Sequence, residues 1–247
     1  SFTDEEYEEQ GATLLDTAKE VWEKAEMIIK VKEPLESEYQ YFRDGLIIFT
    51  YLHLAAEPKL TKALMDSNTV AIAYETVELA NRSLPLLTPM SEVAGRMALQ
   101  EGCTFLEKNY GGKGLLLDGV PGVAPAHVVI IGAGVAGSGA LKRAVGAGAR
   151  VTILDVDVPR LKYLSEIYTG RVETVYSNSY NLNEAIKTAD LVISTVLIPG
   201  EKAPKLVTED MVKAMPDGGV IVDVAIDQGG TVDTITAPTS HTDPVFE

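Results

Sequence analysis

Short apolar runs alternate with amphipathic segments along most of the chain. Apolar runs of about four to eight residues bounded by turn residues are typical of buried strands, whereas apolar residues recurring every three or four positions indicate helices. Strands that alternate with helices predict an α/β protein with parallel sheets. The strand-like runs cover residues 27–31, 46–52, 69–73, 128–131, 151–154, 172–175, 191–196 and 220–224. The helical patterns cover residues 3–11, 16–25, 57–65, 91–109, 183–188 and 209–214.

Two of the predicted helices carry signals at their starts. Thr3 and Glu6 have the spacing of a capping box, in which each side chain bonds the other residue's backbone N–H, and Gly11 is expected to end this helix. Asp16 is expected to cap a second helix that runs to Ala25. The acidic run at residues 4–9 is expected to form a solvated face of the first helix.

The strongest chemical signal follows the apolar run at residues 128–131. Gly132, Gly134 and Gly137 give the spacing G-x-G-x-x-G at a turn from a strand into a helix. The first glycine makes the tight turn, the second lets the backbone approach a pyrophosphate, and the third lets the helix pack against the strand. The free N–H groups at the helix start favour phosphate groups. An ordinary tight turn would explain the glycines alone, but not the glycines together with the strand and helix.

An acidic residue ends the next apolar run at the spacing expected for a ribose-binding side chain. Asp155 lies 18 positions after Gly137. A carboxylate there would accept hydrogen bonds from the ribose hydroxyls and would repel a 2′-phosphate. The sequence therefore predicts NAD, rather than NADP, as the cofactor.

A stretch punctuated by proline, residues 83–89, divides the chain. We place a domain boundary near residue 86, between a leading domain at 1–86 and a dinucleotide-binding domain at 87–247, with the helix at about 91–109 as the connecting element. The glycine-rich loop at 111–125 is the competing boundary. The predicted architecture is two Rossmann-like domains with parallel sheets and an interdomain cleft, because ligands of such sheets bind beyond the carboxyl ends of the strands.

Composition and charge narrow the class of protein. A length of 247 residues, 46% hydrophobic and 23% charged, fits a globular protein with a large core. The net charge of −15 argues against nucleic acid or an anionic membrane as a partner. No apolar stretch is long enough to span a bilayer. The single cysteine, Cys103, excludes an internal disulfide, which fits the cytoplasm, and its apolar neighbours favour a core residue over a nucleophile.

Polar residues follow the strand-like runs of the leading domain. We expect Lys32 to end the first strand, His53 the second, and Tyr74 and Glu75 the third. Lys32 can pair with a carboxylate or polarise a carbonyl, although a solvated lysine is the simpler interpretation. His53 can exchange protons near neutral pH, although a histidine in apolar surroundings is more often a core residue.

In the second domain, Asp227 follows the last run and precedes two glycines. It can orient water or pass protons, or it can simply form a turn, and the residues alone do not decide between these. His127 and His241 are interpreted as loop residues without a role. No Cys or His pair has metal-ligand spacing, and no hydrolase or phosphate-loop signature occurs, so we expect no metal.

Several segments taken together resemble the bacterial L-alanine dehydrogenase family, which is related to the NAD-binding component of proton-translocating transhydrogenase. The resemblance extends over essentially the whole chain and does not depend on the glycine motif. The segments that carry it are residues 30–34, 51–56, 73–77, 84–96, 132–137, 203–207, 222–230 and 239–244.

The resemblance implies reversible, NAD-dependent oxidative deamination of L-alanine to pyruvate and ammonium by a cytoplasmic homo-oligomer, a hexamer in this family. Lys32 and Met90 would contact the substrate, His53 would bond the reacting oxygen and transfer protons, and Asp227 would activate water. The side chains that would contact NAD are those of Ser91, Asp155, Arg160 and Ser177.

The chain also departs from the family pattern. The family has a segment resembling Asn-Arg-Val-Ala that carries a substrate-binding arginine, and another resembling Ala-Asn-Met-Pro after the position of Phe246; neither occurs in this sequence. We therefore expect an incomplete leading domain. Two further interpretations stay open: the NAD(H)-binding component of a transhydrogenase, and a truncated module that binds NAD without chemistry.

Overall fold

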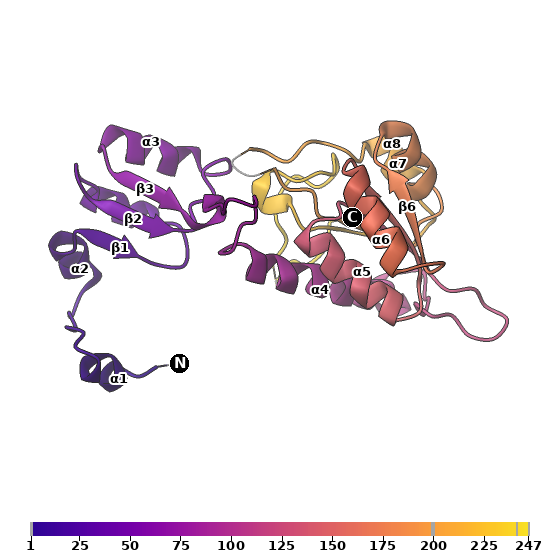
Figure 1. Cartoon of the computed structure of the whole chain (residues 1–247), viewed down its shortest axis with the longest axis horizontal. Helices are drawn as coiled ribbons and strands as arrows, with labels where there is room; N and C mark the ends of the chain where they lie inside the picture. Colours follow the sequence, from indigo (N-terminus) through magenta and orange to yellow (C-terminus); the bar gives the residue numbers. More distant parts are fainter. Residues whose placement is uncertain (1, 199–200, 241, 247) are drawn as a thin grey trace. The chain divides into compact units, whose positions relative to one another are not determined.

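The computed structural model describes residues 2–198, 201–240 and 242–246, and Figure 1 shows its course. The chain divides into two compact units, Ser1–Val77 and Glu78–Glu247. Each unit has its own parallel sheet, so the predicted α/β class is confirmed. The predicted domain boundary near residue 86 stays a prediction.

Unit 1 contains a parallel sheet with the strand order β1-β2-β3. Each predicted strand occurs, although the strands are shorter than the apolar runs. The strands are β1 (Met27–Ile29), β2 (Ile47–Thr50) and β3 (Val70–Ala73). The helices are α1 (Asp4–Glu9), α2 (Ala18–Lys24), α3 (Pro58–Asp66) and the short 3₁₀ helices η1 (Glu36–Tyr41) and η2 (Tyr74–Thr76).

The caps of the first two helices bear out one expectation and correct another. Thr3 and Glu6 form the predicted capping box of α1. For α2, the prediction of Asp16 as the cap is wrong, because Thr17 holds that position. The Thr17 hydroxyl accepts from the Glu20 N–H at 3.3 Å, and the Glu20 carboxylate accepts from the Thr17 N–H at 3.1 Å. The reciprocal pair needs a glutamate three residues after the cap, and Thr17 has one.

The core of unit 1 lies on one face of its sheet. Ile28 and Ile48 point to this face and pack with Trp22 of α2 and with Leu60 and Leu64 of α3. The neighbouring positions of β1, Met27 and Ile29, alternate to the other face and are exposed. The strands are therefore apolar on both faces, as parallel strands are.

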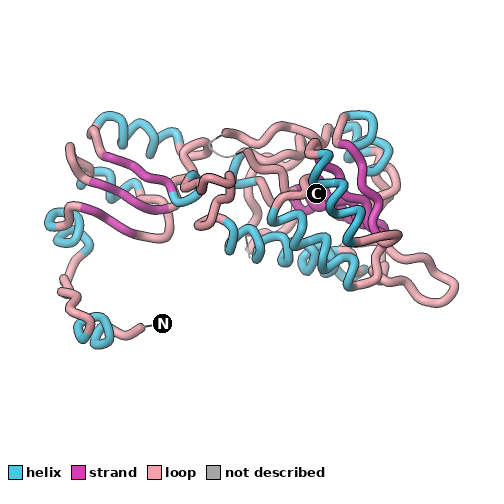
Figure 2. The backbone as a smooth tube through the Cα atoms, in the orientation of Figure 1, coloured by secondary structure: helices cyan, strands magenta, loops and turns pink. Residues whose placement is uncertain are grey.

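Unit 2 has a parallel sheet with the strand order β6-β5-β4-β7-β8. Its strands are β4 (His127–Ile131), β5 (Arg150–Asp155), β6 (Val172–Tyr176), β7 (Leu191–Ser194) and β8 (Val220–Asp223). Its helices are α4 (Thr88–Phe105), α5 (Val135–Gly146), α6 (Val158–Ile167), α7 (Ser179–Ile186), α8 (Glu209–Lys213), η3 (Lys108–Tyr110) and η4 (Ile226–Gln228). Figure 2 shows that the glycine-rich stretch between α4 and β4 is mainly loop.

Two predicted helices of unit 2 begin earlier than expected. The helix predicted at 183–188 begins at Ser179, because the Asn178 side chain caps it by accepting from the Asn181 N–H at 2.8 Å. The helix predicted at 91–109 spans Thr88–Phe105, with a proline in its first turn. Proline is tolerated there because the first N–H groups of a helix have no partner within it.

The sheet of unit 2 is covered on both faces. Val128 and Ile130 of β4 pack with α4, α5 and α6, whereas Val129 and Ile131 pack with α7 and α8. The strand order reverses between β4 and β7, which pair side by side, because the chain runs outward through β5 and β6 before it crosses to β7. This reversal of strand order is the place where such sheets bind ligands. Among the described residues, none of the helices is both long and apolar enough to cross a membrane.

His127 is a buried strand residue, so its interpretation as a loop residue is wrong. It is the first residue of β4, with 5% of its surface exposed. Its Nε2 lies 2.9 Å from the Thr152 hydroxyl, and its Nδ1 lies 3.0 Å from the Thr188 carbonyl oxygen. Burial, followed by the charge of Arg150, lowers the pKa of His127 below its ordinary value. Polar partners within the sheet let a histidine occupy a core position.

We expect acid to destabilise the folded chain through His127. Below pH 6.5 the unfolded chain binds a proton at this imidazole while the folded chain keeps it neutral. The free energy of unfolding should therefore fall as the pH drops from 6.5 towards the lower folded-state pKa. Urea unfolding followed by circular dichroism measures this slope. His127→Gln, which cannot titrate, should flatten it, and an unchanged slope in the variant would contradict the prediction.

Candidate functional site

The turn after β4 has the backbone geometry that the glycine motif predicts. Gly132 has a φ of +99°, a conformation that favours glycine. The Thr195 hydroxyl, just after β7, donates to the carbonyl oxygens of Ile131 at 3.1 Å and Gly132 at 3.2 Å. A Cβ at Gly132 would lie 2.9 Å from that hydroxyl. The turn therefore lies at the switch point of the sheet and is fixed there by β7.

The other two glycines of the motif have different reasons to lack a side chain. A Cβ at Gly137 would lie 1.9 Å from the Gly132 carbonyl oxygen, so helix α5 packs against the turn through bare backbone. At Gly134, the N-cap of α5, nothing lies within 4 Å of a Cβ. Space is therefore left open in front of the helix start, where a phosphate would approach.

Two charged side chains form hydrogen bonds with the backbone of Ala133, the residue between the first two glycines. The Asp155 carboxylate, at the end of β5, accepts from the Ala133 N–H, and the Arg160 Nε donates to the Ala133 carbonyl oxygen at 3.0 Å. A second guanidinium nitrogen of Arg160 donates to the Ser138 hydroxyl at 2.7 Å. Asp155 also accepts from the Asp157 N–H at 2.8 Å. The predicted cofactor residues Asp155 and Arg160 thus shape the turn as well as border it.

A cavity of about 830 Å³ lies beside this turn, within unit 2. Gly134, Asp155 and Arg160 line it together with the basic side chains of Arg96 and Lys142. The structure therefore brings three of the predicted cofactor residues to one cavity. The other four, Ser91, Gly132, Gly137 and Ser177, are not among its described lining residues.

Ser91 and Met90 lie in the first turn of α4, which crosses α5 at backbone contact. Met90 is 44% exposed. One turn further along α4, a Cβ at Gly95 would lie 1.9 Å from the Ala136 carbonyl oxygen of α5. The helix with the predicted contacts Met90 and Ser91 is therefore held directly against the helix that follows the glycine turn.

Ser177 and Asp227 lie just beyond the carboxyl ends of two strands of unit 2. The Ser177 N–H donates to the Asp155 carbonyl oxygen at 2.9 Å, which places it at the carboxyl edge of the sheet. Asp227 lies in η4, just after β8. The loop that carries it is closed by Asp223, whose carboxylate accepts from the backbone N–H of Thr231 at 2.6 Å and of Val232 at 3.1 Å.

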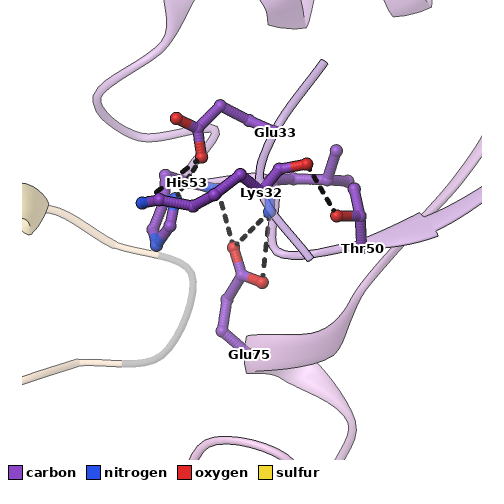
Figure 3. A network of polar contacts seen from close by, with 6 residues as sticks. Lys32, Glu33, Thr50, His53 and Glu75 are labelled. Carbon is purple, nitrogen blue, oxygen red and sulfur yellow. Dashed lines mark hydrogen bonds and ion pairs between the residues drawn. The ribbon is translucent and has the colours of Figure 1, made fainter. Parts of the chain in front are cut away.

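In unit 1, Lys32 and His53 lie beyond their strands rather than at the last strand position, since β1 ends at Ile29 and β2 at Thr50. Figure 3 shows the contacts around them. The Thr50 hydroxyl donates to the Lys32 carbonyl oxygen at 2.9 Å, while the Lys32 side chain is 70% exposed. The imidazole Nδ1 of His53 lies 3.1 Å from the carboxylate of Glu33.

Glu75 has a structural role that the sequence did not reveal. Its carboxylate accepts from the backbone N–H of His53 at 2.7 Å and of Leu52 at 3.1 Å. His53 has a φ of +49°, which is uncommon for a residue with a side chain. The position of Glu75 after a strand was the available signal, but its partners are backbone atoms of another loop. Spacing along the chain cannot show such a bond.

In the described part of the chain, no group of three or more His, Cys, Asp or Glu side chains is arranged to hold a metal. Burial raises the pKa of the Cys103 thiol, and this side chain packs at the edge of the main core of unit 2. A raised thiol pKa disfavours the nucleophilic thiolate.

The chain is thus an α/β protein of two units. In its second unit, β4, the glycine turn and α5 form the strand–turn–helix motif that is typical of dinucleotide-binding domains. The family model described as "Alanine dehydrogenase/PNT, N-terminal domain" matches residues 1–94, and the one described as "Alanine dehydrogenase/PNT, C-terminal domain" matches residues 98–247. The chain therefore belongs to the alanine dehydrogenase/PNT family, and the resemblance seen in the sequence is confirmed.

Individual relatives agree with this assignment. The chain is 62% identical over 247 residues to a protein named alanine dehydrogenase from Methanococcus maripaludis, which matches 100% of the chain and 66% of that relative. A solved structure of an L-alanine dehydrogenase is 54% identical, with a TM-score of 0.84, over 100% of the chain and 68% of that structure. A transhydrogenase structure from Sinorhizobium meliloti is 26% identical, with a TM-score of 0.71, over 94% of the chain and 68% of that structure. The chain thus spans about two thirds of its relatives' length.

The contrast between Gly137 in α5 and Gly134 at its N-cap predicts opposite tolerance to alanine. Gly137→Ala should lower the free energy of unfolding by about 1–3 kcal/mol, because its Cβ would meet the Gly132 carbonyl oxygen at 1.9 Å. This is the net cost that remains after the gain of about 1 kcal/mol that alanine brings to a helix interior. Gly134→Ala should cost well under about 1 kcal/mol, because its Cβ enters open space. Urea titration of both variants tests the contrast, and equal stability of the two would contradict it.

Proposed function

We propose that this chain carries the catalytic and cofactor-binding residues of an NAD-dependent L-alanine dehydrogenase. In the proposed reaction, L-alanine, NAD and water give pyruvate, ammonium and NADH, reversibly. The observation that carries the proposal is the 62% identity over the whole chain to a relative named alanine dehydrogenase. We further propose, as the family resemblance implies, that the protein works as a homo-oligomer, a hexamer, in the cytoplasm.

The residues of unit 2 fit NAD as the cofactor. The open space at Gly134 admits a phosphate to the start of α5, and the cavity beside it has Asp155 in its wall. Each carboxylate oxygen can accept more than one hydrogen bond, so Asp155 can hold Ala133 and still accept from a ribose hydroxyl. When bound, NAD supplies the acceptor for the hydride that leaves the substrate carbon. We propose Ser91, Arg160 and Ser177 as further contacts of NAD.

The proton transfers of the reaction need groups from this chain. We propose that His53 exchanges protons with the substrate and that Asp227 orients the water that hydrolyses the imine. Lys32 would pair with the substrate carboxylate or carbonyl, for which its exposed ammonium group is suited. Met90 would line the substrate pocket.

A second candidate function is that of the NAD(H)-binding component of a transhydrogenase, which the structural likeness at a TM-score of 0.71 supports. The identity of 26% to that structure, against 54% to the L-alanine dehydrogenase structure, favours the dehydrogenase.

The decisive experiment is to measure NADH formation by the purified protein with NAD and L-alanine. Hydride exchange with an NADP-bound partner, without alanine turnover, would reverse the ranking.

Removing either proposed proton-transfer group should slow the reaction without weakening cofactor binding. His53→Ala and Asp227→Asn should each lower turnover by about 10²–10⁴-fold, the usual contribution of general acid–base groups. The double variant should lose little more than the worse single variant, because groups in one proton path act as a unit. Asp233→Asn, an exposed acid that follows the same loop, serves as the control. Near-normal turnover in either single variant would show that its residue only packs or turns the chain.

Replacing Asp155 should relax the preference for NAD. Loss of a charge-assisted hydrogen bond costs roughly 1.5–3 kcal/mol, so Asp155→Ala should weaken NAD binding by about one to two decades. The same change removes the charge that would repel a 2′-phosphate. Calorimetry gives the ratio of the NAD affinity to the NADP affinity. A general loosening of the turn would lower both affinities alike and leave this ratio unchanged, whereas loss of the Asp155 charge should change it. An unchanged ratio would show that Asp155 does not face the ribose.

A further inference from the structure

One carboxylate in unit 1 lies beside both residues proposed to act on the substrate. The Oε2 atom of Glu33 lies 3.1 Å from the Nδ1 of His53 and 3.8 Å from the Nζ of Lys32. Figure 3 shows the three side chains converging, with Glu33 next to the imidazole. The imidazole side chain is 14% exposed and that of Glu33 is 30% exposed, so water screens this pair less than a surface pair.

Both partners of this contact have a fixed backbone. The Tyr51 N–H donates to the Val31 carbonyl oxygen at 3.3 Å, and the Thr50 hydroxyl bonds the Lys32 carbonyl oxygen, so the loop with Glu33 is tied to the end of β2. On the other side, Glu75 holds the backbone N–H of His53. The contact between Glu33 and His53 therefore joins two anchored loops.

The chemistry of the pair fixes the proton on the imidazole. Desolvation raises the pKa of the Glu33 carboxyl, but hydrogen bonds from its own backbone and from His53, with the charge of Lys32, outweigh it and hold that pKa below its ordinary value. An ionised carboxylate can only accept hydrogen bonds, so Nδ1 must carry the hydrogen of this bond. In the neutral imidazole, Nε2 is then the nitrogen that can take up a proton.

We propose that Glu33 is a positioning residue for the reaction: it fixes His53 in the Nδ1–H tautomer, so that Nε2 is the nitrogen that exchanges protons with the substrate, and it keeps the Lys32 ammonium group beside the imidazole. This inference rests on the proposed function. Among the residues that the structure describes, two other titratable groups lie near the imidazole: the Glu75 carboxylate, at the His53 backbone, and Tyr51, whose ring is stacked 6.3 Å from the imidazole centroid. Neither of these is bonded to Nδ1 as Glu33 is.

The test compares Glu33→Gln with a matched control, Glu36→Gln. Glu36 lies three positions further along, is 73% exposed and pairs with Lys59 at 3.2 Å. In the alanine reaction, Glu33→Gln should lower kcat by about 10- to 100-fold, the change that corresponds to losing one charge-assisted hydrogen bond. The KM for NAD should stay unchanged, and Glu33→Asp, which keeps the charge, should recover part of the rate. Glu36→Gln should behave as the parent.

A spectroscopic readout separates positioning from a merely structural effect. Nitrogen NMR of the imidazoles, assigned with His53→Gln because the chain has 3 histidines, should show the Nδ1–H tautomer of His53 in the parent. Glu33→Gln should show a mixture of both tautomers, because an amide can donate to Nδ1 as well as accept from it. A tautomer population that matches that of Glu36→Gln would overturn the proposal.

Failure of the proposed function has a different signature. An unmodified protein that forms no NADH from alanine would refute the dehydrogenase assignment, and with it the catalytic meaning of Glu33. The NMR comparison would still decide whether Glu33 orients the imidazole. Normal alanine turnover with an unchanged His53 tautomer in Glu33→Gln would refute the positioning role alone.

Discussion

Direct contact between backbones is the constraint on which the rest of unit 2 depends. At Gly137 and at Gly95, a single Cβ would come within 1.9 Å of a carbonyl oxygen. These two contacts join the turn after β4 to α5, and α5 to α4. Because no flexible side chain lies between the packed backbones, the turn, the helix start and the first turn of α4 form one rigid group. This packing determines the relative positions of Gly132, in the turn, and Ser91, in α4, both of which we propose as cofactor contacts.

Carboxylates that bond backbone N–H groups organise the loops at the strand ends of both units. Glu75 holds the loop of His53, Asp155 holds the glycine turn, and Asp223 closes the loop of Asp227. Each follows or ends a parallel strand, so each lies at the carboxyl edge of its own sheet. A charged acceptor forms a stronger bond to an N–H than a neutral one does. Loops held in this way can keep reactive side chains in a fixed geometry.

Some of these acids and bases have two roles. Asp155 and Arg160 shape the glycine turn through bonds within the protein, and we also propose them as contacts of NAD. A turn that is shaped by the protein's own bonds loses little conformational entropy when a ligand binds. The Glu33–His53 contact has the same character in unit 1, because a side chain of the protein orients the imidazole. Preorganisation of this kind is what proton transfer and hydride transfer both require.

The sequence by itself determined the α/β class, each of the strands, the turn at Gly132 and the identity of the family. These features are local, since a buried strand needs an apolar run and the turn needs glycines at fixed spacing. Only the tertiary structure decided that His127 is buried in β4, and that Glu33 and Glu75 hold the imidazole and backbone of His53. Glu33 and His53 are 20 positions apart, and Glu75 is 22 positions from His53. Such bonds depend on which strands pair and where their loops end, and spacing along a chain does not encode the distance between two loops.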